Sequence, residues 1–242
     1  MGGIYDKLES SLQGIAAELG AKPRAVLCVS GHWESPDFAV MGAKEPGMVY
    51  DYSGFPPFTY SIRYAAPGAP DVAARVRELM PGTRIDMQQG FDHGTFAPLV
   101  VMYPEADMPV LQLSIRSDYE VEAHLEAGRA LRALREEGVL ILGSGFSYHN
   151  LRLLGPMGAK PSSEFDAWLR ETLCENVGES RNERLRQWER APSARIAHPR
   201  EDHLVPLMVA VGAAEDGAGT RVYFEDTFLG ALTASSYRFG AV

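Results

Sequence analysis

The chain has 242 residues, of which 45% are hydrophobic and 23% are charged, an ordinary globular composition that excludes disordered and fibrous proteins. It carries 23 lysines and arginines against 32 aspartates and glutamates, so its formal net charge is −9, and we expect no binding to nucleic acid or to anionic membranes. No apolar run approaches the roughly 18 residues that a membrane helix needs, and no secretory signal pattern opens the sequence, so we expect a cytoplasmic protein.

Helical and strand patterns alternate along the chain. In chain order we expect a helix over 5–19, a strand over 25–30, a helix over 71–80, a strand over 109–115, a helix over 119–137, a strand over 139–143, helices over 162–176 and 203–213, and a strand over 221–224. The segment 25–30 is a short continuous apolar run, which is typical of a strand buried on both faces, and the segment 109–115 also indicates a buried strand. This alternation predicts an α/β layered sheet in a single domain that spans residues 1–242.

Some local features carry expectations of their own. Asp71 is expected to cap the helix that begins there. In the long amphipathic helix, Leu125 is expected to point away from the buried face, and His124 to lie at the edge of that face, solvated or half-buried. Residues 44–70 are rich in proline, glycine and tyrosine without a clear period, and such a segment is often functional. Residues 176–200 are polar and weakly patterned, and we expect them to form a surface excursion.

Four of the six histidines fall at the edges of predicted elements. His32 and His149 follow predicted strands, His93 lies at a loop-to-helix junction, and His203 comes just before a helix. Sites in open α/β sheets lie beyond the carboxyl ends of the strands, so these positions favour one shared site. A single such histidine is more often only a hydrogen-bonding residue, but imidazole is also the commonest metal ligand and a natural acid or base near neutral pH.

Familiar catalytic motifs are absent from the sequence. It contains no HExxH or CxxC pattern and no glycine-rich phosphate loop, and Ser144 between two glycines falls short of the nucleophile elbow of serine hydrolases. The histidine spacing is therefore a weak metal signal by itself. A zinc-dependent hydrolase stays open as an alternative, because zinc would use the same histidines.

Several separate motifs nevertheless carry a family resemblance. They are GHWE at 31–34, FDHG at 91–94, PVLQLSI at 109–115, the run ending in HNLR at 145–152, and DHLVPL at 202–207. In this order they resemble the class III extradiol ring-cleaving dioxygenases of the LigB superfamily, and in particular the DOPA 4,5-dioxygenase-like branch. The resemblance runs from about residue 5 to the C-terminus.

The resemblance implies a three-layer α/β/α fold around a central, mostly parallel or mixed sheet, with a metal ion at the strand ends. It maps metal ligands onto His32 and His203. It maps an active-site acid or base, which contacts the metal in some members, onto His149. It places His93 in the substrate pocket, where it is also a catalytic candidate, and His198 in the second shell of the metal.

The implied reaction is the opening of a catecholic ring by O2. Non-haem Fe(II) suits this chemistry, and Zn(II) is possible as a bound metal. Tyr52 and Phe55 could line an aromatic substrate pocket, with Tyr50, Phe58 and Tyr60 beside them, although the same rings could simply pack a loop onto the core. The carboxylates that could support the ligands are Glu34, Asp92, Glu201 and Asp202.

One departure from the family concerns the start of the chain. The family begins with a strand that ends in a His-Gly-x-Pro turn and supplies a further ligand, whereas this sequence starts just beyond that turn. The departure keeps open a second alternative, a catalytically impaired or non-catalytic remnant that binds aromatic ligands. The sequence leaves the oligomeric state open between monomer and homodimer.

Overall fold

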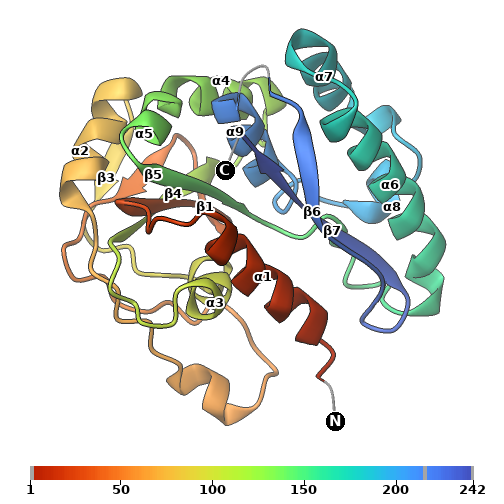
Figure 1. Ribbon diagram of the computed structural model, residues 1–242, viewed down its shortest axis with the longest axis horizontal. Coiled ribbons are helices and arrows are strands. Elements are labelled where there is room, and N and C mark those ends of the chain that lie inside the picture. The colour runs from red at the N-terminus through yellow and green to blue at the C-terminus, as the bar shows by residue number, and fades with distance from the viewer. Residues whose placement is uncertain (1–2, 215–216, 241–242) are drawn as a thin grey trace.

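A mixed five-stranded sheet forms the centre of the molecule in the computed structural model, which describes residues 3–214 and 217–240 (Figure 1). The strands are β1 (Ala25–Ser35), β2 (Ala39–Met41), β3 (Arg84–Asp86), β4 (Val110–Arg116) and β5 (Val139–Ser144). Their order is β3-β2-β4-β1-β5, with β1 parallel to both β4 and β5 and with β2 antiparallel to β4. The expected three-layer α/β fold with a mixed sheet is confirmed.

Helices cover the sheet and extend beyond it. They are α1 (Asp6–Glu18), η1 (Pro57–Ser61), α2 (Pro70–Leu79), α3 (His93–Met102), α4 (Val121–Leu131), α5 (Ala133–Glu136), α6 (Pro156–Cys174), α7 (Gly178–Arg186), η2 (Trp188–Arg190), α8 (Ala194–Ala197) and α9 (Val205–Ala214). Helix α3 packs against β1 and contacts α1, whereas α9 packs against β1 and β5 and contacts α4. The hairpin β6 (Gly219–Phe228) with β7 (Leu232–Phe239) lies between this body and α6 (Figure 1).

The apolar runs of the sequence became the central strands because both of their faces are covered. Residues 25–29 of β1 and 110–115 of β4 are fully or almost fully buried. Toward the carboxyl ends of these strands the buried side chains turn polar, with Ser30, Gln112 and Ser114 all shielded from solvent. A second apolar cluster joins α6, α8, α9 and the hairpin, around Phe165, Trp188 and Met208.

Helix α4 corrects two expectations. His124 is fully buried rather than solvated or half-buried, and Leu125 is buried in the second cluster rather than turned outward. Leu125 is buried because α9 packs closely on α4, where a Cβ on Gly128 would lie 2.2 Å from the carbonyl oxygen of Val209, whereas the ring of His124 packs edge-on against Phe38 with centroids 5.3 Å apart. The imidazole of His124 bridges two main-chain groups, since Nε2 lies 3.1 Å from the amide of Arg116 and Nδ1 lies 2.7 Å from a carbonyl of its own helix.

Two further expectations are wrong. Asp71 does not cap α2, which begins one residue earlier at Pro70; its carboxylate pairs instead with Arg24 at 2.5 Å. Residues 176–200 are not a bare surface excursion, because they carry α7, η2 and α8 and bury side chains such as Leu185 and Trp188. Among the described residues, no helix is both long and apolar enough to cross a lipid bilayer.

Candidate metal centre

Irregular backbone in β1 places His32 near the carboxyl ends of the strands, where the candidate site lies. The strand pairs regularly with β4 up to Val29, and the register then shifts before pairing resumes at Glu34. Gly31 and His32 lie inside this interruption, and such bulges commonly redirect side chains beside active sites. His32 is therefore free to leave the sheet plane while both of its neighbouring strand segments stay paired.

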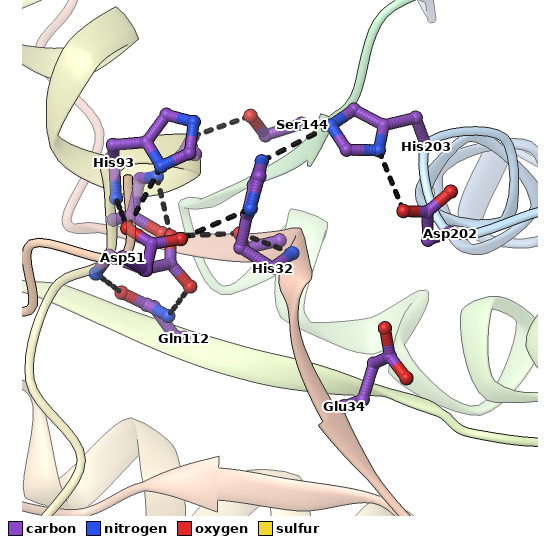
Figure 2. Close-up of polar contacts among 12 residues, drawn as sticks. His32, Glu34, Asp51, His93, Gln112, Ser144, Asp202 and His203 are labelled. Carbon is purple, nitrogen blue, oxygen red and sulfur yellow. Dashed lines mark hydrogen bonds and ion pairs between the residues drawn. The ribbon is translucent and has the colours of Figure 1, made fainter. Parts of the chain in front are cut away.

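Two histidines that are far apart in sequence meet at these strand ends. The Nε2 atom of His32 lies 3.1 Å from the Nε2 atom of His203, which precedes α9 (Figure 2). Two nitrogens that each bond one ion at about 2.1 Å must lie within about 4.2 Å of each other. The observed separation therefore allows both imidazoles to bind a single ion.

Carboxylates hold the opposite ring nitrogens of this pair. Asp51 Oδ2 lies 3.1 Å from His32 Nδ1, and Asp202 Oδ2 lies 3.2 Å from His203 Nδ1 (Figure 2). A carboxylate beside Nδ1 favours the tautomer that carries the proton on Nδ1, which leaves the lone pair on Nε2 of each ring. Two lone pairs facing each other at 3.1 Å repel unless a proton or a cation lies between them, so the donor set fits a bound metal ion.

Burial and neighbouring charges shift the pKa values of His32, His203 and Asp51. Burial lowers the pKa of His32, but the hydrogen bond and charge of Asp51, with the charges of Asp92 and Asp202, raise it above its ordinary value overall. Burial and the neighbouring histidines lower the pKa of His203. Burial raises the pKa of Asp51, but its hydrogen bonds with two histidines outweigh burial and leave the pKa far below the ordinary range. Asp51 is therefore ionised beside His32, and its negative charge favours a cation on this side of the site.

His149 packs directly on His203. The two ring centroids are 3.3 Å apart with an angle of 19° between the planes, and His149 Nδ1 lies 4.0 Å from Asp202 Oδ1. Burial and the charge of His203 lower the pKa of His149 to about 4, so its ring is neutral at neutral pH. A neutral imidazole in this position is able to serve as a further ligand.

The end of helix α8 and the residue after it hold the loop of His149 in place. The amide of His149 donates to the carbonyl oxygen of Ala197 at 3.0 Å, and His198 Nε2 lies 3.1 Å from the carbonyl oxygen of Ser147. His198 is fully buried, and burial lowers its pKa to about 3, so its neutral ring donates Nε2–H to that carbonyl. His198 therefore supports the loop that carries His149 and does not face the histidine pair itself.

Glycines bring the backbone of His203 close to the strand ends. A Cβ on Gly31 would lie 2.5 Å from the carbonyl oxygen of Asp202, and a Cβ on Gly145 would lie 2.3 Å from that of His203. Contacts this short are impossible for any other residue type without a backbone shift. The two glycines thus set how deeply His203 enters the site.

His93 lies on the other side of His32. Their ring centroids are 3.9 Å apart, and His93 Nδ1 lies 2.8 Å from Asp51 Oδ1, so its Nε2 is left as an acceptor. Asp92 caps α3 by accepting from the amide of Thr95 at 3.0 Å, and Gln112 donates to its other oxygen at 2.8 Å. This buried network fixes the first turn of α3 and with it the position of His93.

Aromatic rings border His93 on the side of the irregular segment 44–70. The ring of Tyr52 lies 5.2 Å from that of His93, and Phe55 lies 5.5 Å from Tyr52. The Tyr52 hydroxyl donates to the carbonyl oxygen of Thr59 at 2.7 Å, so it is turned away from the imidazole. Tyr52 is partly buried whereas Phe55 is 56% exposed, so Phe55 forms the outer rim of this aromatic border.

The structure thus brings together His32, His93, His149 and His203, as the sequence indicated. Glu34 does not contact these histidines; its carboxylate binds Arg200 at 2.6 Å and Tyr119 at 2.7 Å. Similarly, the Glu201 side chain pairs with Arg195 at 2.7 Å.

Sequence reasoning missed Asp51. The available signal was that Asp51 is the only charged residue between Glu45 and Arg63, in a stretch otherwise dominated by aromatic, glycine and proline residues. An aspartate is also an ordinary turn residue, so this signal by itself marks Asp51 only as a candidate.

Comparisons with known proteins identify the family of the chain. Residues 3–240 match the family described as the catalytic LigB subunit of aromatic ring-opening dioxygenase. The chain is 37% identical to a 4,5-DOPA dioxygenase extradiol of Beta vulgaris over 226 residues, which cover 90% of this chain and 83% of the relative. It is 35% identical to the protein of that name from Portulaca grandiflora over 236 residues, covering 91% and 84%. The crystal structure of an uncharacterized protein from Escherichia coli K12 superposes with a TM-score of 0.80 at 29% identity, covering 96% of this chain and 92% of that one.

Proposed function

The chain belongs to the LigB family and is an extradiol ring-opening dioxygenase, and from this premise we propose that it opens a catecholic ring at an Fe(II) ion bound by His32 and His203. The observation that carries the proposal is the 3.1 Å approach of the two Nε2 atoms, each with a carboxylate behind its ring. The extradiol enzymes among the relatives support the reaction class.

The donor set suits non-haem iron. When bound, Fe(II) would provide open positions for the two adjacent catechol oxygens and for O2, and would pass electron density between them. His149 would be the third ligand, because its neutral ring stacks on His203 beside Asp202. Zinc accepts the same nitrogen donors, so the identity of the ion must be tested directly.

His93 is the residue best arranged to accept a proton from a catechol hydroxyl. Asp51 holds its Nδ1–H at 2.8 Å, so the Nε2 lone pair is free, and the side chain is 32% exposed and open to a substrate. A carboxylate on one imidazole nitrogen orients the other for proton transfer, as in catalytic triads. His149 is the second candidate for this role, and the two assignments predict different variants.

His93→Ala and His149→Ala separate these roles. His93→Ala should keep metal affinity and lose turnover by roughly 100-fold or more, the usual contribution of a general base. His149→Ala should weaken metal binding as well. If instead His149→Ala keeps the metal and loses turnover alone, then His149 is the proton-transfer residue and His93 is not.

The substrate ring would lie against the aromatic border. Tyr52 and Phe55 offer apolar faces next to His93, and the Tyr52 hydroxyl is already committed to the backbone. Flat aromatic substrates pack well on such a surface. Two residues would support the site from outside it, since Glu34 ties Arg200 to the end of β1 and His198 holds the loop that carries His149.

Anaerobic reconstitution with Fe(II) tests the proposal. The protein is then given air-saturated buffer and a panel of catechols that includes DOPA, while an electrode follows O2 and a spectrophotometer follows product. We expect one O2 consumed for each catechol and a yellow semialdehyde product, and no uptake by His32→Ala. If no catechol causes O2 uptake, the protein is an aromatic-binding remnant; O2-independent ester hydrolysis by the zinc form would indicate a hydrolase.

A further inference from the structure

Asp51 contacts two histidines of the site with separate oxygen atoms. Its Oδ1 accepts from the amide of His93 at 3.0 Å and lies 2.8 Å from His93 Nδ1, while its Oδ2 lies 3.1 Å from His32 Nδ1 (Figure 2). We propose that Asp51 is a positioning residue that holds the ligand His32 and the proton-transfer residue His93 in one fixed relation. This inference rests on the proposed function.

Backbone contacts fix Asp51 itself. The amide of Val49 donates to the carbonyl oxygen of Phe91 at 2.8 Å, and the amide of Phe91 donates to that of Gly47 at 2.8 Å. A Cβ on Gly90 would lie 2.4 Å from the Gly47 carbonyl oxygen, so the two chain segments are in direct backbone contact. The irregular segment is thereby bound to the entry of α3, which brings Asp51 to His93.

The site has a repeated pattern. Asp51 lies between His32 and His93, and Asp202 lies near both His203 and His149. The two histidine–carboxylate–histidine groups face each other through the Nε2 atoms of His32 and His203. Asp51 contacts both of its histidines within 3.1 Å, whereas Asp202 Oδ1 lies 4.0 Å from His149 Nδ1, so the closer positioning contact is that of Asp51.

The two oxygens of Asp51 are not equivalent, which makes an amide substitution informative. In Asp51→Asn, one position must become an NH2 donor. The Oδ1 position cannot accept that change, because the amide of His93 donates to it and a main-chain N–H has no alternative role. The NH2 group must therefore take the Oδ2 position and face His32.

A donor opposite His32 Nδ1 reverses the tautomer of that ring. Nδ1 must then accept, so the proton moves to Nε2, the atom that faces His203 and the proposed ion. His93 keeps its partner on Oδ1. Asp51→Asn should consequently remove His32 as a ligand while leaving His93 oriented, which no loss of packing would do.

Metal binding to the apo-protein tests this inference without substrate or O2. Co(II) titration, followed by the ligand-field absorption of the ion, should show roughly 10- to 100-fold weaker affinity for Asp51→Asn than for the wild type. This is the typical effect of losing a carboxylate that supports a ligand histidine. Histidine 15N spectra of the zinc-loaded proteins should show His32 with Nδ1–H in the wild type and Nε2–H in the variant, with His93 unchanged. Asp107→Asn is the matched control, because Asp107 pairs with Lys22 on the surface.

The outcomes are distinct. Wild-type affinity and an unchanged His32 tautomer in Asp51→Asn would overturn the inference and leave the proposed function intact. A wild-type protein that binds no Co(II) would overturn the metal-dependent function, and the role of Asp51 with it. Weak binding together with a changed His93 signal would also contradict the inference, since it predicts an effect confined to His32.

Discussion

Alanine at position 145 would place a methyl carbon 2.3 Å from the carbonyl oxygen of His203, and 2.9 and 3.0 Å from its carbonyl carbon and Cα. Ordinary contacts of this kind begin at 3.4 Å, so His203 would have to move by about 1 Å. Gly145 has no left-handed φ, so the substitution adds crowding and no backbone strain. The displaced atoms belong to main chain, which cannot yield as a flexible side chain does.

The displacement should act on the site more than on the fold. A shift of about 1 Å in a catalytic group can lower the rate by about 100-fold, whereas overpacking of this size costs about 1–3 kcal/mol of unfolding free energy. We therefore expect Gly145→Ala to weaken Co(II) binding and to lower kcat/KM by about 100-fold while still unfolding cooperatively.

Matched measurements decide the point. Metal titration, O2 uptake and thermal unfolding are compared with those of Gly14→Ala, because Gly14 lies in α1 with no atom within 4 Å of an added Cβ. The control should keep full activity and gain up to about 1 kcal/mol of stability. Wild-type metal affinity and kcat/KM in Gly145→Ala would refute the claim that this glycine sets the position of His203.

Further predictions concern the substrate surface, a buried histidine, a loop contact and the ion. Tyr52→Phe should lose about 1 kcal/mol of stability with its hydroxyl bond and keep KM, whereas Tyr52→Ala should raise KM in steady-state assays. Burial lowers the pKa of His124 below its ordinary value of 6.5, so its neutral form stabilises the fold above that pH and this stability is lost as the pH falls. Below the ordinary pKa, denaturation curves should show the wild type losing at most about 1.4 kcal/mol of unfolding free energy per pH unit relative to His124→Gln. The reason is that a protonated ring no longer accepts the hydrogen bond from the amide of Arg116. Equal pH dependence of the two proteins would contradict this prediction. Glu34→Gln should cost no more than about 1 kcal/mol in chemical denaturation, because Arg200 is largely exposed. Chelation should lower the melting temperature, since an ion at about 100 times its Kd adds about 2.7 kcal/mol; an unchanged melting temperature would mean that no ion is bound.

The sequence by itself determined three strands of the sheet and the general place of the site. The runs at 25–30 and 109–115 predicted β1 and β4, which are covered on both faces, and the run at 139–143 predicted β5 at the edge of the sheet. Histidines that follow such strands must lie at their carboxyl edge, so the positions of His32 and His149 followed from local pattern.

Tertiary structure decided the burial and the distances that depend on contacts between segments far apart in the sequence. Leu125 is buried because α9 covers α4 on a face that helical periodicity assigns to solvent, and His124 is buried because its ring packs against Phe38, next to β2. Asp51 lies in a segment without a period, and only main-chain bonds to Phe91 bring it to the histidines. The 3.1 Å between His32 and His203 spans 171 positions of sequence, and such a distance is set by packing of whole elements, which no local pattern encodes.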